Sequence, residues 1–342
     1  MSGTTSTLSP ERTTAPAGPA KAPGALGGAI RAAVRQHKWA LRITLALLVL
    51  VVGVWAGLRV WLEASGVSPD ANNYGVRSAK MLAKYAADVF SVLPLLVGAF
   101  VAGPLIGREL ESGTYKMAWT QSMSPARWLT IRLALPLTLV VVGVLLLNVS
   151  YRLLRGPFID DPLAGWYQGG IYQGLGPASL AYCVLAVALG ALVGLLVRRS
   201  VVSMAVTALA MGLLATLMSN VRGGLWPMRT DVGPEAAIVT AHAQETRWGH
   251  GAGWQDAQGV RIDPGACENA ASEASMKRPD AYESVFEKCM ADRGATTQYG
   301  DYHSTADFLP IQLVESAVLL GLAALAVVAS YGLLRTRHGG RA

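Results

Sequence analysis

The sequence predicts an all-α polytopic membrane protein with six transmembrane helices and a long polar segment between the fifth and sixth. The first observation is composition, because 52% of the 342 residues are hydrophobic and only 15% are charged, whereas soluble domains carry about a quarter charged residues. The second is the mean hydropathy of +0.37. The third is that the apolar residues gather into six long runs separated by polar stretches, as membrane-spanning helices require.

The chain begins with a stretch rich in Ser, Thr, Pro, Ala and Gly, residues 1–24, which we predict to be a disordered tail. In residues 25–38, Leu26, Ile30 and Val34 recur at helical spacing beside basic residues. This pattern fits a basic amphipathic helix on the inner membrane surface, or a positive flank of the first span. The first apolar run is longer than that of a signal peptide and lacks a small-x-small cleavage site, so we expect an uncleaved anchor.

Six apolar runs are long enough, or nearly so, to cross a bilayer. The predicted spans are 39–61, 89–106, 133–147, 180–197, 201–218 and 311–334. Pro94 and Pro104 in the second span predict a kink, because proline removes a helical hydrogen bond. In the fourth span, Gly190 and Gly194 form a GxxxG spacing that allows close helix approach.

The stretch between the second and third spans, residues 107–132, reads GRELESGTYKMAWTQSMSPARWLTIR. It is too polar for hydrocarbon, and its helix-forming first half could present one aromatic and apolar face. Two interpretations remain, a solvated connector and a docking surface for a soluble partner. Glu109 and Glu111 lie two residues apart and point about 200° apart on a helix, so one could contact a partner while the other pairs with Arg108, Arg127 or Arg132.

The distribution of basic residues predicts the orientation. Six spans place both termini on one side, and the segments on that side carry fifteen Lys and Arg. The two shorter opposite loops, with Arg59, carry six. By the positive-inside rule, we expect a multi-pass protein of the bacterial cell membrane with both termini cytoplasmic.

The polar segment 220–310 is then extracytoplasmic. It is net acidic, with eight Lys or Arg against thirteen Asp or Glu, and has a helical pattern near residues 279–293. Because disulfides form outside the cytoplasm, we predict a disulfide between Cys267 and Cys289. Cys183 lies in an apolar run, and we predict that it is a small, buried hydrophobic residue.

Glu315 is the acidic residue within a predicted span, and intramembrane carboxylates are functional candidates. It lies about one turn from the outer end of its helix, so headgroup level or a pair with Arg59 or Arg152 is expected, and we favour a structural role. His242, His250 and His303 match no zinc spacing, and we expect no metal site.

The sequence has no Gly-Lys dipeptide and therefore no phosphate-binding loop, and no GxSxG or HExxH motif. The spans also lack a central ionisable residue that would suit proton coupling. We therefore expect no enzyme activity, no bound cofactor and no nucleic-acid partner, with energy supplied by another molecule.

Glu109-Leu-Glu111-Ser-Gly113-Thr114, followed by Trp119 and by Arg127-Trp-Leu, resembles a segment of the permease subunits of bacterial type-2 ABC exporters. The resemblance covers all six spans in order, and the sequence Phe308-Leu-Pro-Ile-Gln-Leu-Val-Glu315 resembles the start of the last span in a subgroup. It implies that the central stretch contains a cytoplasmic coupling helix that docks on a separate ATPase. The implied partner-binding residues are Glu109, Glu111, Gly113, Thr114, Trp119 and Arg127.

The same resemblance implies two soluble ABC ATPase subunits that hold ATP and Mg, and a second permease subunit as a homo- or heterodimer in the lipid membrane. The expected organisation is a tail (1–24), an amphipathic helix with five spans (25–219), an outer segment (220–310), and the sixth span with a basic tail (311–342). Two alternatives stay open: a membrane-anchored enzyme or sensor acting through 220–310, and a non-transporting structural membrane subunit.

Overall fold

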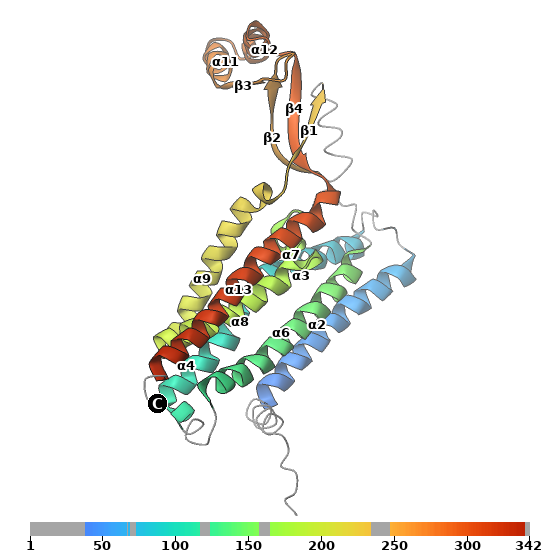
Figure 1. Cartoon of the computed structure of the whole chain (residues 1–342). Coiled ribbons are helices and arrows are strands. Elements are labelled where there is room, and N and C mark those ends of the chain that lie inside the picture. The colour runs from blue at the N-terminus through green and yellow to red at the C-terminus, as the bar shows by residue number, and fades with distance from the viewer. Residues whose placement is uncertain are drawn as a thin grey trace, which may run out of the picture. The chain divides into compact units, whose positions relative to one another are not determined.

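The computed structural model describes residues 38–66, 68, 73–116, 124–156, 165–233 and 247–338 (Figure 1). Its contacts divide the chain into two compact units, residues 1–43 and 44–342. Of the first unit, only residues 38–43, the start of helix α2, are described. The predicted tail and the amphipathic helix fall on residues outside the described ranges.

Among the described residues, six helices are long and apolar enough to cross a membrane. This result confirms the predicted all-α polytopic fold. The helices that contain these candidate spans are α2 (Lys38–Ser65), α3 with η1 and α4 (Tyr74–Val97, Gly98–Ala102, Gly103–Ser112), α6 (Pro125–Arg155), α8 (Ala178–Val197), α9 (Ser200–Val221) and α13 (Phe308–His338).

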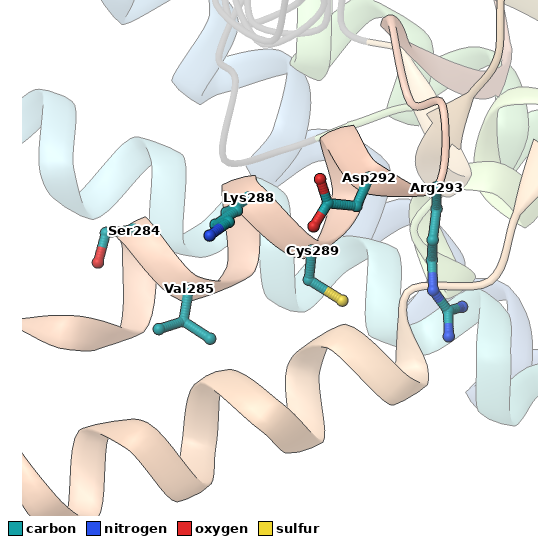
Figure 2. A pocket seen from close by; sticks show the side chains of 6 residues that line it. All are labelled: Ser284, Val285, Lys288, Cys289, Asp292 and Arg293. Atoms are coloured by element: carbon teal, nitrogen blue, oxygen red, sulfur yellow. The ribbon is translucent and has the colours of Figure 1, made fainter.

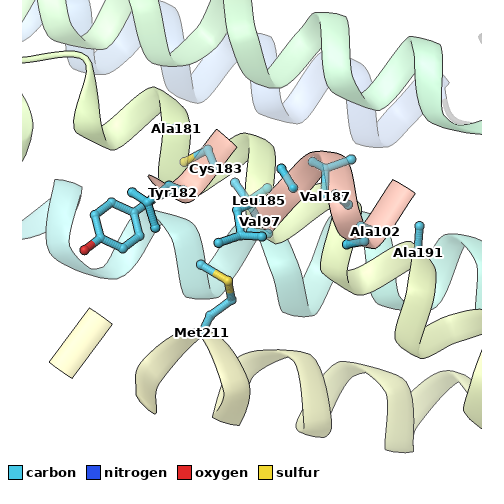
Figure 3. Packing of buried hydrophobic residues seen from close by; sticks show 14 of the residues in the cluster. Val97, Ala102, Ala181, Tyr182, Cys183, Leu185, Val187, Ala191 and Met211 are labelled. Carbon is cyan, nitrogen blue, oxygen red and sulfur yellow. The ribbon is translucent and has the colours of Figure 1, made fainter. Parts of the chain in front are cut away.

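Helix α8 forms the centre of the bundle, because it contacts α13, α4, α6 and α9. Its sequence is almost wholly apolar and small, and most of its length is buried. Figure 3 shows Tyr182, Leu185 and Ala191 of α8 packed with residues of neighbouring helices. A Cβ at Gly190 would lie 2.8 Å from the Ala102 Cβ. The GxxxG spacing therefore serves a close approach between α8 and the second span of the same chain.

The second span is interrupted between its two prolines. Pro94 lies inside α3, residues Gly98–Ala102 form the π-helical turn η1, and Pro104 lies in the first turn of α4. Proline lacks the amide hydrogen that an α-helix needs, and π-turns are found where the regular hydrogen-bond ladder is disturbed. The α-helix of the second span is thus interrupted by a π-helical turn between its two prolines.

A second apolar cluster holds α2 against α3 and α6. Trp55, Phe90 and Tyr151 contribute one ring from each helix, with ring centroids 5.3–6.5 Å apart. The short helix α7 (Gly169–Leu175) packs against α3, and a Cβ at Gly170 would lie 2.2 Å from the Ala87 carbonyl oxygen. Only glycine permits that approach.

Residues 229–303, here called the sheet segment, contain a four-stranded antiparallel sheet in the order β1-β4-β2-β3. Its strands are β1 (Arg229–Gly233), β2 (Trp248–Gln255), β3 (Arg261–Ile262) and β4 (Thr297–His303). The sequence did not predict this sheet, because β2 reads WGHGAGWQ and β4 reads TQYGDYH, which are poor in β-branched residues.

Between β3 and β4 lie helices α11 (Gly265–Lys277) and α12 (Ala281–Asp292). Helix α12 coincides with the helical pattern near residues 279–293. A disulfide joins Cys267 of α11 to Cys289 of α12, with 5.5 Å between the Cα atoms, which confirms the predicted pair. Cys183 is free and buried.

Candidate functional site

Two polar clusters lie at opposite ends of the bundle. One is at the end where α4 finishes and α6 begins, here called the α4–α6 end. The other is where α9 finishes and α13 begins, here called the sheet end because both helices lead into the sheet segment (Figure 1).

Glu109 joins the second span to the third at the α4–α6 end. Its Oε1 lies 2.6 Å from an Arg132 guanidinium nitrogen, and its Oε2 accepts a hydrogen bond of 3.1 Å from the Trp128 indole nitrogen. The side chains of Arg132 and Glu109 are 25% and 13% exposed, and Trp128 is buried. Of the three arginines expected as partners, Arg132 thus pairs with Glu109, in a largely buried contact.

Glu111 joins the second span to the fifth. Its Oε2 accepts a hydrogen bond of 3.0 Å from the backbone amide of Ser200, the first residue of α9. A carboxylate at a helix N-terminus satisfies an amide that has no intrahelical partner and also meets the positive end of the helix dipole. Glu111 therefore acts as a capping group for α9.

Close backbone packing supports this connection. A Cβ at Gly107 would lie 3.1 Å from the Ser200 Cα, and one at Gly103 would lie 3.3 Å from the Met204 amide nitrogen. Thr130 adds a further contact, because its hydroxyl lies 2.7 Å from the Tyr331 hydroxyl of α13. The end of the second span is thus connected directly to α6 and α9, and α6 to α13.

The remaining implied partner-binding residues lie around the turn after α4. Gly113 ends α4 in the left-handed conformation with φ 71°, which glycine adopts most readily. The Thr114 hydroxyl lies 3.0 Å from that of Ser112. Arg127 is exposed in the first turn of α6, where its amide donates to the Ser124 hydroxyl. Trp119 lies outside the described residues.

At the α4–α6 end we expect different costs for the two glutamates. Glu109→Ala should lower the free energy of unfolding by about 1–3 kcal/mol, because it leaves the half-buried Arg132 without its counterion. Glu111→Ala should cost about 1 kcal/mol, as for loss of a helix cap. Thermal unfolding of the purified protein in detergent measures both.

Glu63→Ala is the matched control, because Glu63 forms an exposed ion pair of 2.6 Å with Arg59 within one helix and its loss should cost at most about 0.5 kcal/mol. An unchanged unfolding temperature for Glu109→Ala would contradict the buried pairing.

Glu315 lies at the sheet end in a fully buried site. Arg222 holds it through two hydrogen bonds, Nε to Oε2 at 3.0 Å and Nη2 to Oε1 at 3.1 Å. The hydroxyls of Tyr172 and Tyr182 each donate to one carboxylate oxygen at 2.6 Å. The carboxylate thus accepts four hydrogen bonds from three different elements, which is the arrangement that a buried charge requires.

The expected pairs of Glu315 with Arg59 or Arg152 are wrong. Arg59 pairs with Glu63 on its own helix, and Arg152 donates a hydrogen bond to the Leu175 carbonyl. Arg222 falls within the predicted polar segment 220–310, yet its side chain is only 4% exposed and its guanidinium carbon lies 3.9 Å from the centre of the Tyr172 ring. Helix α9 ends at Val221, and Arg222 is the first residue of the short 3-10 helix η4 (Arg222–Leu225) that follows it.

Neighbouring side-chain amides complete the sheet end. Gln312 Nε2 donates to the Tyr172 carbonyl at 2.6 Å, while its Oε1 accepts from the Ala178 amide at 2.8 Å. Asn148 of α6 donates to the Gly176 carbonyl and to the Ser179 hydroxyl, each at 3.0 Å. The bonds to Tyr172, Gly176 and Ala178 satisfy backbone groups in α7, at its C-cap and at the start of α8.

The sheet segment meets the bundle through aromatic rings. Trp166 contacts Trp248 of β2 and Phe308 of α13, with ring centroids 5.9 and 5.6 Å apart. His250 and His303 lie 4.9 Å apart between ring centroids. Partial burial lowers the pKa of His250, and the neighbouring His303 lowers it further. His250 is therefore mainly neutral near pH 7.

No group of three or more potential metal ligands occurs among the described residues, and His242 lies outside them. A surface hollow of about 500 Å³ is lined by α12 and the residue after it (Figure 2). Lys288, Asp292 and Arg293 are among the residues that line it. These mixed charges do not form an arrangement that would select one ligand.

The fold and the two clusters together define a multi-pass membrane protein whose helices are joined by polar contacts at both ends. Residues 43–222, more than half of the chain, match the ABC-2 membrane transporter related family. The chain therefore belongs to this family and is an ABC-type permease, a transport subunit rather than an enzyme. No match was found among curated proteins or among solved structures.

Proposed function

We propose that this chain exports a substrate across the cell membrane, driven by ATP that is hydrolysed on a separate soluble ATPase subunit. Two copies of that ATPase, with their ATP and Mg, and a second permease subunit would complete the transporter. The proposal rests on the family match over residues 43–222, because this range contains every residue that connects α4 to α6 and α9.

The contacts at the α4–α6 end suggest how motion would be transmitted. A partner that moves the turn after α4 would also displace Glu109 and Glu111, which are bonded to α6 and α9. Because Glu109 is largely buried and Glu111 caps a helix, we infer that both act by holding the spans together. Exposed Arg127 and the turn at Gly113 and Thr114 are then better placed to meet the ATPase.

Such coupling drives transport only if the ATPase binds the two conformations of the permease with different affinities. Stiff connections favour this difference, because displacement of one helix end is then shared by its neighbours instead of being absorbed locally. The apolar middle of the bundle, built on small residues of α8, offers smooth surfaces along which the spans can shift.

The experiment is affinity purification of the tagged chain from its own membrane. We expect a soluble ATPase to co-purify, and the chain alone to show no ATP hydrolysis above background. Arg127→Glu should reduce the amount of ATPase recovered, while Arg59→Glu, at the other end of the bundle, should not. Robust hydrolysis by the purified single chain would overturn the proposal.

We further propose that both termini and the α4–α6 end are cytoplasmic and that the sheet segment is extracytoplasmic. A cysteine introduced at Gln258, which is exposed, should react with an impermeant maleimide in intact cells, whereas one at Ser2 should react only after lysis. The background is low, because Cys183 is buried and the other two cysteines form a disulfide. Labelling of both positions in intact cells would show that the orientation is wrong.

A further inference from the structure

The Arg222–Glu315 pair is one residue away from a contact between the sheet segment and the turn that follows α9. Gly223 follows Arg222, and its carbonyl oxygen lies 2.9 Å from Nε2 of His303, the last residue of β4. Since a carbonyl can only accept, Nε2 carries the hydrogen and His303 donates. A continuous path therefore runs from Glu315 through Arg222 and Gly223 to β4, one of the two inner strands of the sheet.

A second histidine holds Gly223 from another strand. A Cβ at Gly223 would lie 2.2 Å from Cε1 of His250 in β2, so any side chain there would have to displace the ring. Trp248 supports His250, with ring centroids 4.2 Å apart. The backbone of residue 223 is thus seated against side chains from the two inner strands of the sheet.

The ion pair also fixes how the short 3-10 helix η4 (Arg222–Leu225), which follows α9, lies against α13. Both Arg222 bonds are aligned with one carboxylate, and both tyrosine hydroxyls use the same two oxygens. A small shift of α13 along its axis would move Glu315 and misalign all four bonds together. Elements joined by such a set of bonds occupy a few discrete relative positions and do not slide through a continuous range of positions.

We propose that Arg222 and Glu315 are positioning residues that make the sheet segment move with the adjoining ends of α9 and α13 during the transport cycle. This inference rests on the proposed function, because it concerns how a movement produced by the ATPase reaches the far end of the chain. An apolar pair of similar size would hold the fold at least as well, but would allow α9 to shift without moving the sheet.

The test compares amide hydrogen exchange in the complex that co-purifies with the chain, with and without ATP and Mg. In the wild-type complex we expect ATP to change exchange in α4 and also in β4. In Arg222→Met/Glu315→Met we expect the α4 change to persist and the β4 change to be lost. A purely structural role would alter exchange in both nucleotide states equally and would leave the ATP-dependent difference in β4 intact.

Asn148→Leu is the matched control, because it removes a buried polar contact at the same end of the bundle without touching Arg222 or Gly223. It should keep the β4 response. Gly223→Ala should lose the β4 response although the ion pair is intact, because the added Cβ displaces the His250 ring. Gly223→Ala/His250→Ala should regain the β4 response, because it removes this clash. If the double methionine variant does not fold, Glu315→Gln takes its place.

Two outcomes would overturn the inference while the proposed function stands. One is a wild-type complex in which α4 responds to ATP and β4 does not. The other is a β4 response that is unchanged in the ion-pair variant. Absence of a response in α4 itself would overturn the proposed function, and this inference with it.

Discussion

Replacement of Glu315 by alanine is expected to lower the free energy of unfolding by about 3–5 kcal/mol, the cost of breaking a buried ion pair. Arg222 would then remain as a cation with 4% of its surface exposed. Its nearest compensation is the face of the Tyr172 ring at 3.9 Å, and a cation–π contact contributes only about 2 kcal/mol in a desolvated site. Thermal unfolding and size-exclusion profiles in detergent measure the loss.

The double variant Arg222→Met/Glu315→Met separates the effect of the buried charges on stability from the effect of side-chain volume. Removing both partners leaves no uncompensated charge, so its stability should be close to that of the wild type. Tyr182→Phe removes one hydrogen bond to the carboxylate and should cost about 1–3 kcal/mol. Equal destabilisation by the single and the double replacement would show that burial of an unpaired charge is not the cause.

Replacement of both Cys267 and Cys289 by serine is expected to cost the sheet segment about 3 kcal/mol, from the chain entropy of a closed loop of this length. The two cysteines are 22 residues apart and join α11 to α12. Few other buried side chains hold these helices, since Ala271, Ala281 and Met290 are the additional buried hydrophobics there. Loss of the bond should therefore open the helix pair and leave the spans folded.

Hydrogen exchange resolves this local effect. Amides of residues 265–292 should exchange faster in the serine variant, whereas those of α8 should not change. Cys183→Ala is the control for loss of a thiol without loss of a covalent bond. Free thiols at both positions in protein isolated without reductant would contradict the disulfide itself.

The membrane-spanning part of the fold follows from the sequence because hydrocarbon imposes a simple requirement. Each span needs a long apolar run with internally satisfied backbone groups, and the six runs meet it. The ends of the helices were harder to predict. Helix α4 continues to Ser112 and α6 begins at Pro125, because charged side chains such as Glu109 and Arg132 find partners within the protein and so need not lie in a loop.

The sheet was missed for a different reason. Its strands contain glycine at several positions, such as Gly251 and Gly253 in β2, where periodicity carries little signal. Aromatic rings supply the packing instead, as where ring carbons of Tyr299 lie 3.0 Å from the position of a Cβ at Gly253. Contacts of this type depend on cross-strand neighbours, which one sequence does not reveal.

One feature of the sequence could have predicted the pairing of Glu315 with Arg222. Arg222 stands just after the fifth apolar run and Glu315 near the start of the sixth, so consecutive spans place opposite charges at the same level of the membrane. The hydrogen bonds from Tyr172 and Tyr182 to the same carboxylate depend on how α7 packs against α8. Sequence spacing does not determine that packing.

The order in which these partners are synthesised has a consequence for biogenesis. Arg222 is made 93 residues before Glu315, and β1 is made before the central strand β4 with which it pairs. While the ribosome translates the intervening residues, the arginine has no counterion and can only extend toward the lipid headgroups. The helix pair closed by the disulfide can form during that interval. Release of the last span then supplies both the carboxylate and β4, so insertion of α13 and completion of the sheet become a single late step of assembly.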